Sequence, residues 1–248
     1  MKNTTLILLI FLGSFIIACN KDFINDVPVL GKLTKSCGKT CLLKIIDGTD
    51  TTFYTDLEKI AYHAEYQTHF NTKYDGSYVS LSYPGGDPGY QQGVCTDVVI
   101  RALRLMNIDL QELIHNDMKA NHSLYNKRYK TQTIDKNIDH RRTQNIQTYL
   151  TKLGAKIEIP ISPNEYKPGD ILFWDISAGH TGIVSNTKSG ITGNYYVVHN
   201  IGRGAQYEDL LQSWQPIEVY RLNDNSLQIM KEKSSFKYDL TKDFKIKE

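Results

Sequence analysis

One cysteine in a glycine-rich setting constrains this chain more than any other feature. Cys95 follows the loop 83–89, which reads Tyr-Pro-Gly-Gly-Asp-Pro-Gly, and it opens a helical pattern that ends near Asn107. A thiol in the first turn of a helix lies at the positive end of the helix dipole, which lowers its pKa and favours the thiolate. The sequence therefore predicts a nucleophilic cysteine at a helix start.

Two histidines follow in strand-like segments and supply the groups that such a thiol needs. His180 comes after Gly179 at the start of Gly-His-Thr-Gly-Ile-Val, and His199 ends Tyr-Val-Val-His. We expect His180 to accept the proton of Cys95, with His199 or its neighbour Asn200 orienting His180. Neighbouring residues of a strand point to opposite faces, so only one of these two can do so, and we favour His199. Backbone N–H groups at the helix start would form part of an oxyanion site.

Two other interpretations of these residues remain open. A free cysteine is most often a small buried hydrophobic residue, and a single histidine is most often packed in a core. Cys95, His180 and His199 could also bind zinc, although the chain has no HxxxH-type pair or close cluster of Cys and His. We expect neither a metal nor another cofactor.

The N-terminal segment resembles a bacterial lipoprotein signal. Lys2 precedes an apolar run at 6–12 that is too short to span a bilayer, and the segment ends in Ala18-Cys19. Cys19 is then expected to become the lipid-bearing first residue of the mature protein. An ordinary signal peptide with an incidental cysteine is the alternative.

The other cysteines leave Cys95 without a partner. Cys37 and Cys41 are close enough in sequence to form a small disulfide loop in an oxidising compartment, or they stay as two free thiols. Cys95 would then be an unpaired thiol outside the cytosol, which calls for a functional reason.

The chain divides into four predicted segments. These are a signal peptide at 1–18, a tether and lead-in at 19–50, one hydrolase domain at 51–222 and a charged, loosely attached C-terminal tail at 223–248. Within the domain, helical patterns come first and short strands later, which predicts an α+β fold with an antiparallel meander. The predicted helices start at the Thr55/Glu58 capping box, at Cys95, at Asp109 and at Asp139, and the predicted strands are 171–174, 180–185, 195–200 and 218–222.

Charged and polar residues near these motifs are candidate substrate contacts. Asp97 lies two residues after the thiol, where it can cap the helix or meet substrate. Arg141 and Arg142 fall in the first turn of a predicted helix, where they oppose its dipole. An anionic ligand would explain that placement, and two solvated arginines are the equally weighted alternative. Asn200 completes the predicted substrate-binding set. The formal net charge of +2 is close to neutral, so no nucleic-acid partner is indicated.

Five motifs together resemble the bacterial family DUF1287. They are Gly-Val-Cys-Thr-Asp at 93–97, Asn-Ile-Asp-His-Arg-Arg at 137–142, Pro-Gly-Asp at 168–170, Gly-His-Thr-Gly-Ile-Val at 179–184 and His-Asn-Ile-Gly at 199–202, within a region of resemblance that covers about 55–222. That family is similar to NlpC/p60-type papain-like peptidases, which cut peptide bonds in bacterial cell walls.

This resemblance implies a papain-like fold, with helices and a catalytic cysteine at a helix start packed on a small antiparallel sheet. It places the cysteine of the wider clan at Cys95, its strand histidine at His180 and its third polar residue at His199. The clan usually has Asp-Cys-Ser-Gly around the thiol, whereas here the carboxylate follows the cysteine, at Asp97. That departure leaves the substrate less well defined than the catalytic pair.

The resemblance and the residues lead to one expected function. We expect a monomeric cysteine hydrolase, held to the membrane by a lipid on Cys19 and facing the periplasm or the cell exterior. Cys95 would attack an amide carbonyl of a peptidoglycan stem peptide and form a thioester, and the carboxylates of such a peptide would suit Arg141 and Arg142. A non-catalytic lipoprotein that binds wall peptide and a thiol acyltransferase are the alternatives.

Overall fold

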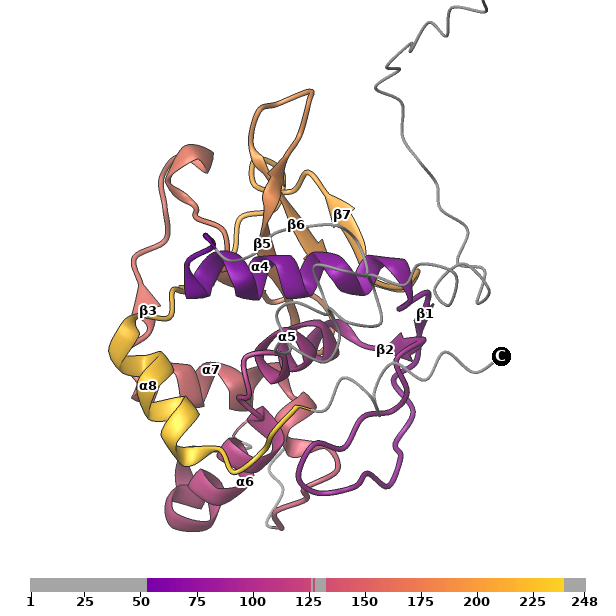
Figure 1. Ribbon diagram of the computed structural model, residues 1–248, viewed down its shortest axis with the longest axis vertical. Helices are drawn as coiled ribbons and strands as arrows, with labels where there is room; N and C mark the ends of the chain where they lie inside the picture. The colour runs from indigo at the N-terminus through magenta and orange to yellow at the C-terminus, as the bar shows by residue number, and fades with distance from the viewer. Residues whose placement is uncertain (1–52, 126, 128–132, 239–248) are drawn as a thin grey trace, which may run out of the picture. The chain divides into compact units, whose positions relative to one another are not determined.

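The computed structural model describes residues 53–125, 127 and 133–238. The predicted signal peptide 1–18 with the lipid-bearing Cys19, the tether 19–50, and the Cys37 and Cys41 pair all lie outside these residues. The described part has a mixed α+β architecture, in which helices pack on one face of an antiparallel sheet (Figure 1).

The main sheet has six strands in the order β3-β8-β4-β5-β6-β7, and every neighbouring pair is antiparallel. The strands are β3 (Lys156–Ile157), β4 (Ile171–Trp174), β5 (His180–Lys188), β6 (Tyr195–His199), β7 (Gln206–Glu208) and β8 (Glu218–Tyr220). The meander is confirmed from β4 to β7. The chain then returns to place β8 between β3 and β4, so the sheet is not a simple meander throughout.

Five α-helices accompany the sheet in the described residues, together with a two-stranded parallel pair. The helices are α4 (Asp56–Tyr66), α5 (Cys95–Arg104), α6 (Leu110–Asn121), α7 (Thr143–Lys152) and α8 (Asp224–Lys233), and the parallel pair is β1 (Lys73–Tyr74) with β2 (Gln92–Gly93). Both α4 and α5 pack against β5, and α4 crosses in front of that strand in Figure 1.

Two of the predicted helix starts show when a side chain caps a helix and when it does not. Thr55 and Glu58 form the expected capping box at α4. The start predicted at Asp139 is wrong, because α7 begins at Thr143 and residues 139–141 form a short 3₁₀ turn. The Asp139 carboxylate accepts the backbone N–H of Asp135, on the preceding segment, at 2.6 Å. It therefore stabilises the turn before α7.

The sheet separates two apolar cores because its side chains alternate between its two faces. The larger core joins the helices to one face and includes Ile171, Phe173 and Ile183. The smaller core covers the opposite face with Leu172 and Val184. The strand β4 is buried on both faces, which explains why its sequence is apolar throughout.

The segment after 222 is part of the domain over its described length, which corrects the expected loose tail at 223–248. Leu227 and Met230 of α8 enter the larger core. Beyond the helix, the backbone N–H groups of Ser235 and Phe236 donate to the Glu112 carboxylate of α6 at 2.8 and 3.3 Å. The segment is rich in lysine, and its few apolar residues lie on one face of α8. Its composition alone therefore did not predict that it packs on the domain.

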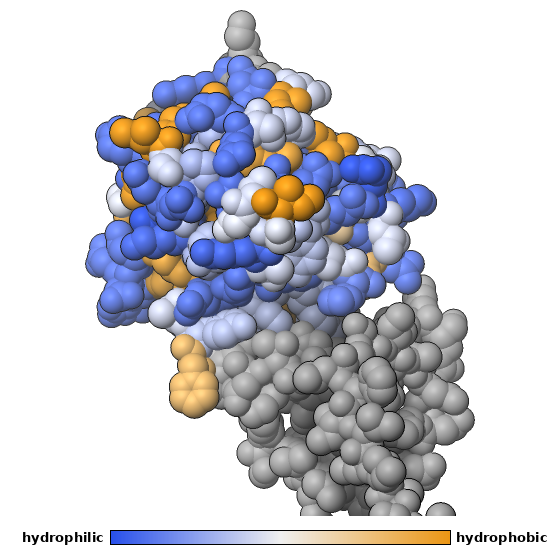
Figure 2. Space-filling view, turned by 90° about the horizontal axis from the view of Figure 1, so that it is seen from above, coloured by the Kyte–Doolittle hydropathy of each residue, from blue (hydrophilic) through white to orange (hydrophobic). Residues whose placement is uncertain are grey.

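The surface mixes polar and apolar groups. Figure 2 shows one face on which apolar side chains lie in small separate patches among hydrophilic ones. Within the described ranges, none of the helices combines the length and the apolar character required to cross a bilayer.

We predict that α8 contributes to the stability of the domain. Met230→Ala should lower the free energy of unfolding by about 2–5 kcal/mol, because it leaves a cavity in the larger core. Lys233→Ala, on the exposed end of the same helix, should change it by less than about 0.5 kcal/mol. Urea unfolding followed by circular dichroism measures both, and equal values for the two variants would contradict the packing of α8.

Candidate active site

The thiol occupies the predicted place at a helix start. Cys95 is the first residue of α5, and the Asp97 carboxylate accepts the Val94 backbone N–H at 2.7 Å, which ends the preceding loop. Gly93 allows this close approach, because a Cβ atom there would lie 2.8 Å from the Asp97 carboxylate. The glycine and the carboxylate together set where α5 begins.

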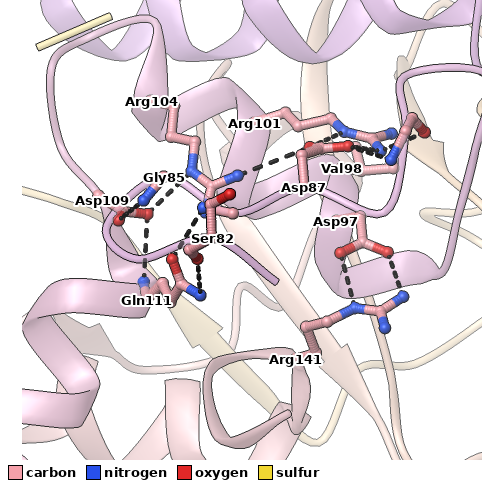
Figure 3. A network of polar contacts seen from close by, with 12 residues as sticks. Ser82, Gly85, Asp87, Asp97, Val98, Arg101, Arg104, Asp109, Gln111 and Arg141 are labelled. Atoms are coloured by element: carbon pink, nitrogen blue, oxygen red, sulfur yellow. Dashed lines mark hydrogen bonds and ion pairs between the residues drawn. The ribbon is translucent and has the colours of Figure 1, made fainter. Parts of the chain in front are cut away.

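Buried ion pairs fasten the glycine-rich loop to α5. Arg101 makes two hydrogen bonds of 2.7 Å to Asp87 of the loop. Arg104, one turn further along the helix, donates to Asp109 at 2.8 Å, and Asp109 also accepts the Gly85 backbone N–H at 2.8 Å (Figure 3). The loop before the thiol is therefore held to the same helix that carries the thiol.

The two predicted histidines contact each other directly. Nε2 of His180 lies 2.7 Å from Nδ1 of His199, across the neighbouring strands β5 and β6. Gly182 pairs with His199 in this ladder, and a Cβ atom at Gly182 would lie 3.0 Å from that of His199. Gly182, the second glycine of the Gly-His-Thr-Gly motif, therefore makes room for His199 beside His180.

Asn200 faces away from His180 and joins the end of β6 to Gly93 of β2, two residues before the thiol. Its Nδ2 donates to the Gly93 carbonyl at 3.0 Å, and its Oδ1 accepts the backbone N–H groups of Gly202 and Gly204, each at 3.2 Å. Both ends of the amide are thus engaged by backbone. Asn200 positions the approach to Cys95, and its predicted role in substrate binding stays a prediction.

A backbone contact brings the thiol beside the strand that carries His180. The N–H of Thr181, the residue after His180, lies close enough to the Cys95 sulfur to lower the pKa of the thiol. Cys95 and Gly179, the residue before His180, also share a pocket of about 290 Å³. The rest of that pocket is formed by Tyr74, Gly76, Val94, Ile138, Arg141, Arg142, Thr143 and Ala178.

The expected lowering of the Cys95 pKa is wrong. The residue is only 6% exposed, and burial raises the pKa of its thiol to about 11. The N–H groups of Thr181, Thr96 and Cys95 itself lower this pKa, but they do not offset burial, and the nearby Asp97 charge raises it further. Cys95 stands at a helix start as predicted, but the desolvation of its thiolate outweighs the effect of the helix dipole.

His180 is also neutral at physiological pH. Burial lowers the pKa of its imidazole to about 3, and the neighbouring His199 lowers it further. The free protein therefore holds a neutral thiol and a neutral imidazole at pH 7, and no thiolate–imidazolium pair.

The charged residues predicted to bind substrate are paired with one another or with neighbours. Arg141 donates to both oxygens of Asp97, at 3.0 and 2.8 Å, and both side chains are buried (Figure 3). Arg142 pairs with Asp139 at 2.8 Å and is partly exposed. The Arg141 charge is thus balanced inside the protein, which explains the arginine without an anionic ligand. Substrate binding by these residues stays a prediction.

Sequence reasoning missed Glu208 as a neighbour of this histidine pair. Glu208 of β7 lies 3.4 Å from Nε2 of His199, and β7 is too short for a periodic signal. The Trp174 and Trp214 rings lie 5.6 and 6.3 Å from that of His180. The pairing of Trp174 with His180 on neighbouring strands follows from the register alone.

A search of the described residues for three or more His, Cys, Asp or Glu side chains arranged to hold a metal ion finds no such group. The zinc alternative therefore gains no support there. In the same ranges, Cys95 is a free, buried cysteine.

Comparison with known proteins establishes the family. A family model described as a domain of unknown function, DUF1287, matches residues 61–222. The chain belongs to the DUF1287 family. This DUF1287 chain is 44% identical over 150 residues to the uncharacterized protein YijF of Escherichia coli strain K12, a match that covers 60% of this chain and 73% of that protein. No solved structure matches.

We predict that the buried pair in this DUF1287 domain is structural. Arg141→Met should lower the free energy of unfolding by about 3–5 kcal/mol, because it leaves the Asp97 carboxylate buried without its partner. Lys156→Met, which removes one member of an exposed pair with Glu218, should cost about 1 kcal/mol or less. Urea unfolding measures both. An Arg141→Met protein of full stability that binds wall peptide poorly would instead support the substrate role.

We also predict slow alkylation of Cys95. With a pKa of about 11, roughly one thiol in a thousand is ionised at pH 8, so iodoacetamide should react on the order of 100-fold more slowly than with an exposed cysteine. The rate should rise steadily between pH 8 and 11. Mass spectrometry of the Cys95 peptide measures it, with Ser80→Cys as the exposed reference. Equal rates at pH 7 would show that the thiolate is stabilised after all.

Proposed function

We propose that this DUF1287 protein is a papain-like cysteine hydrolase that cleaves amide bonds in peptidoglycan peptides. The observation that carries the proposal is the 2.7 Å contact between His180 and His199, on a strand whose next residue, Thr181, approaches the Cys95 thiol with its backbone N–H. A nucleophile, a base and a group that orients the base are the parts such a hydrolase needs.

Only one ring nitrogen of His180 would be left to take the proton of the thiol. Its Nε2 is engaged by His199, so Nδ1 is the atom that would receive the proton of Cys95. Since both groups are neutral at rest, proton transfer would accompany attack rather than precede it, as in hydrolases that activate a neutral nucleophile. The charge would then develop only when substrate is bound.

The reaction follows from these positions. The Cys95 sulfur attacks the amide carbonyl as its proton passes to His180, and backbone N–H groups at the start of α5 stabilise the oxyanion. His180 returns the proton to the leaving amine, which leaves a thioester on Cys95. Water, deprotonated by His180, then releases the acid and restores the thiol.

The pocket suits the end of a peptide. It measures about 290 Å³, and aromatic, aliphatic and charged side chains share its wall, among them Tyr74, Ile138 and Arg142. A stem peptide carries both aliphatic side chains and carboxylates. We place the protein at the cell envelope as a monomer, held to the membrane by a lipid on Cys19, as its N-terminal sequence suggests.

The burial of Cys95 favours one second candidate, a lipoprotein that binds wall peptide without cutting it. A thiol that is 6% exposed and protonated at pH 7 is what a non-catalytic core cysteine would be. In that case the same pocket would hold the peptide, and Cys95 would only pack.

We predict that the protein releases peptide fragments from purified peptidoglycan. Cys95→Ala and His180→Ala should each lower the rate by about 10³-fold or more, because both remove a reacting group. Mass spectrometry of the digested wall measures this, and new free carboxyl and amino ends identify hydrolysis, whereas a new amide identifies acyl transfer.

The outcomes separate the candidates. Full activity of the Cys95→Ala protein would refute the thiol mechanism. Retention of wall fragments by both wild type and Cys95→Ala, with no new ends in either digest, would establish the binding protein instead. Thermal unfolding of each variant checks that the loss of activity is not loss of fold.

A further inference from the structure

The short strand β7 brings a carboxylate to the far side of the histidine pair. In the β6–β7 ladder, Val197 pairs with Glu208 and His199 with Gln206. Glu208 is therefore the diagonal neighbour of His199 on the same face of the sheet, within reach of a long side chain. The Oε2 atom of Glu208 lies 3.4 Å from Nε2 of His199, and the Glu208 side chain is about three-quarters buried.

An arginine determines which oxygen of Glu208 is available. Arg203 donates to the other oxygen, Oε1, at 3.0 Å, and it is the exposed member of the chain of contacts. The charged and titratable groups that face His199 are therefore His180 from β5, Glu208 from β7 and Arg203 from the loop between β6 and β7. Glu208 is the member of this set whose charge lies at Nε2 of His199, at 3.4 Å.

We propose that Glu208 is a positioning residue that keeps the proton of neutral His199 on Nε2 and so leaves His180 Nδ1 free to act as the base. The inference rests on the proposed function, since it concerns how His180 receives the proton of Cys95.

The charge of Glu208 sets where the protons lie from β7 to β5. A carboxylate 3.4 Å from Nε2 favours the tautomer of His199 that carries its hydrogen there, and this tautomer presents the lone pair of Nδ1 to His180. His180 must then donate from Nε2, which leaves the lone pair on its Nδ1. When His180 takes the proton of Cys95, the positive charge is stabilised through His199 by the Glu208 carboxylate.

Glu208→Gln is the sharpest test. With Arg203 still donating to Oε1, the new amide nitrogen faces His199 and donates to Nε2, so the hydrogen of His199 must move to Nδ1. His180 Nε2 then becomes an acceptor, its Nδ1 carries the hydrogen, and the base is lost. We expect kcat for wall cleavage to fall by about 10²-fold or more, with KM changed by less than about twofold.

A second substitution should reverse this effect. In the Glu208→Gln, Arg203→Ala double variant the amide is free to rotate and present its oxygen to His199. We expect the original tautomer to return, and with it about a tenth or more of the wild-type kcat. Arg203→Ala alone serves as the matched control, because a carboxylate accepts in either orientation, and we expect its tautomer and kcat to stay close to those of the wild type.

Nitrogen-15 NMR of the histidine rings in the full chain reads the tautomer without any substrate. The wild type should show His199 protonated at Nε2, and Glu208→Gln should show it protonated at Nδ1. An unchanged tautomer in Glu208→Gln, or a fall in kcat that the double variant does not reverse, would overturn the proposal. Failure of the proposed function would show differently, as full wall cleavage by Cys95→Ala with the tautomer shift still present.

Discussion

The pairing of β5 with β6 is the constraint on which the candidate site depends. The two strands align Gly182 with His199, so that the imidazole of His180 reaches across to His199 at 2.7 Å. A one-residue slip of β6 against β5 would turn His199 to the face opposite His180. Gly182 permits the alignment, because any side chain there would collide with Val197 and His199. The register is thus set by packing, and the histidine contact follows from it.

Two further contacts tie this strand pair to the helix that carries the thiol. The Asn200 side chain donates to the Gly93 carbonyl from the end of β6, and the Thr181 backbone N–H approaches the Cys95 sulfur from the start of β5. Each contact joins a side chain on one element to a backbone group on the other. The ion pairs of Arg101 and Arg104 with Asp87 of the preceding loop then keep the helix start from shifting. The candidate site lies where these fixed elements converge.

Burial changes the chemistry that the residue types alone imply. A helix start should favour a thiolate, yet desolvation raises the Cys95 pKa to about 11 and lowers that of His180 to about 3. The resting pair is neutral, and a nucleophile would arise only when substrate is bound. The same preference for paired or neutral groups inside the protein explains Arg141, whose charge Asp97 balances.

Local pattern was enough to predict several parts of the fold. The Thr55/Glu58 box, the start of α5 at Cys95 and the apolar strand β4 each depend on neighbouring residues, and each is confirmed. The strand alternation that sets His199 and Asn200 on opposite faces is local too. Where a side chain had a distant or unexpected partner, prediction failed. Asp139 binds backward to Asp135, and α8 looked like a tail because its few apolar residues carry no signal of what they pack against.

The sequence by itself determined which residues could react and on which elements they stand, because glycines, caps and alternation act over a few residues. Only the tertiary structure decided that β8 inserts beside β4, that Glu208 of a three-residue strand reaches His199, and that the thiol is protonated. The strand order, the Glu208 contact and the protonation of the thiol all depend on packing and burial, and the segments that pack together there are distant in the sequence.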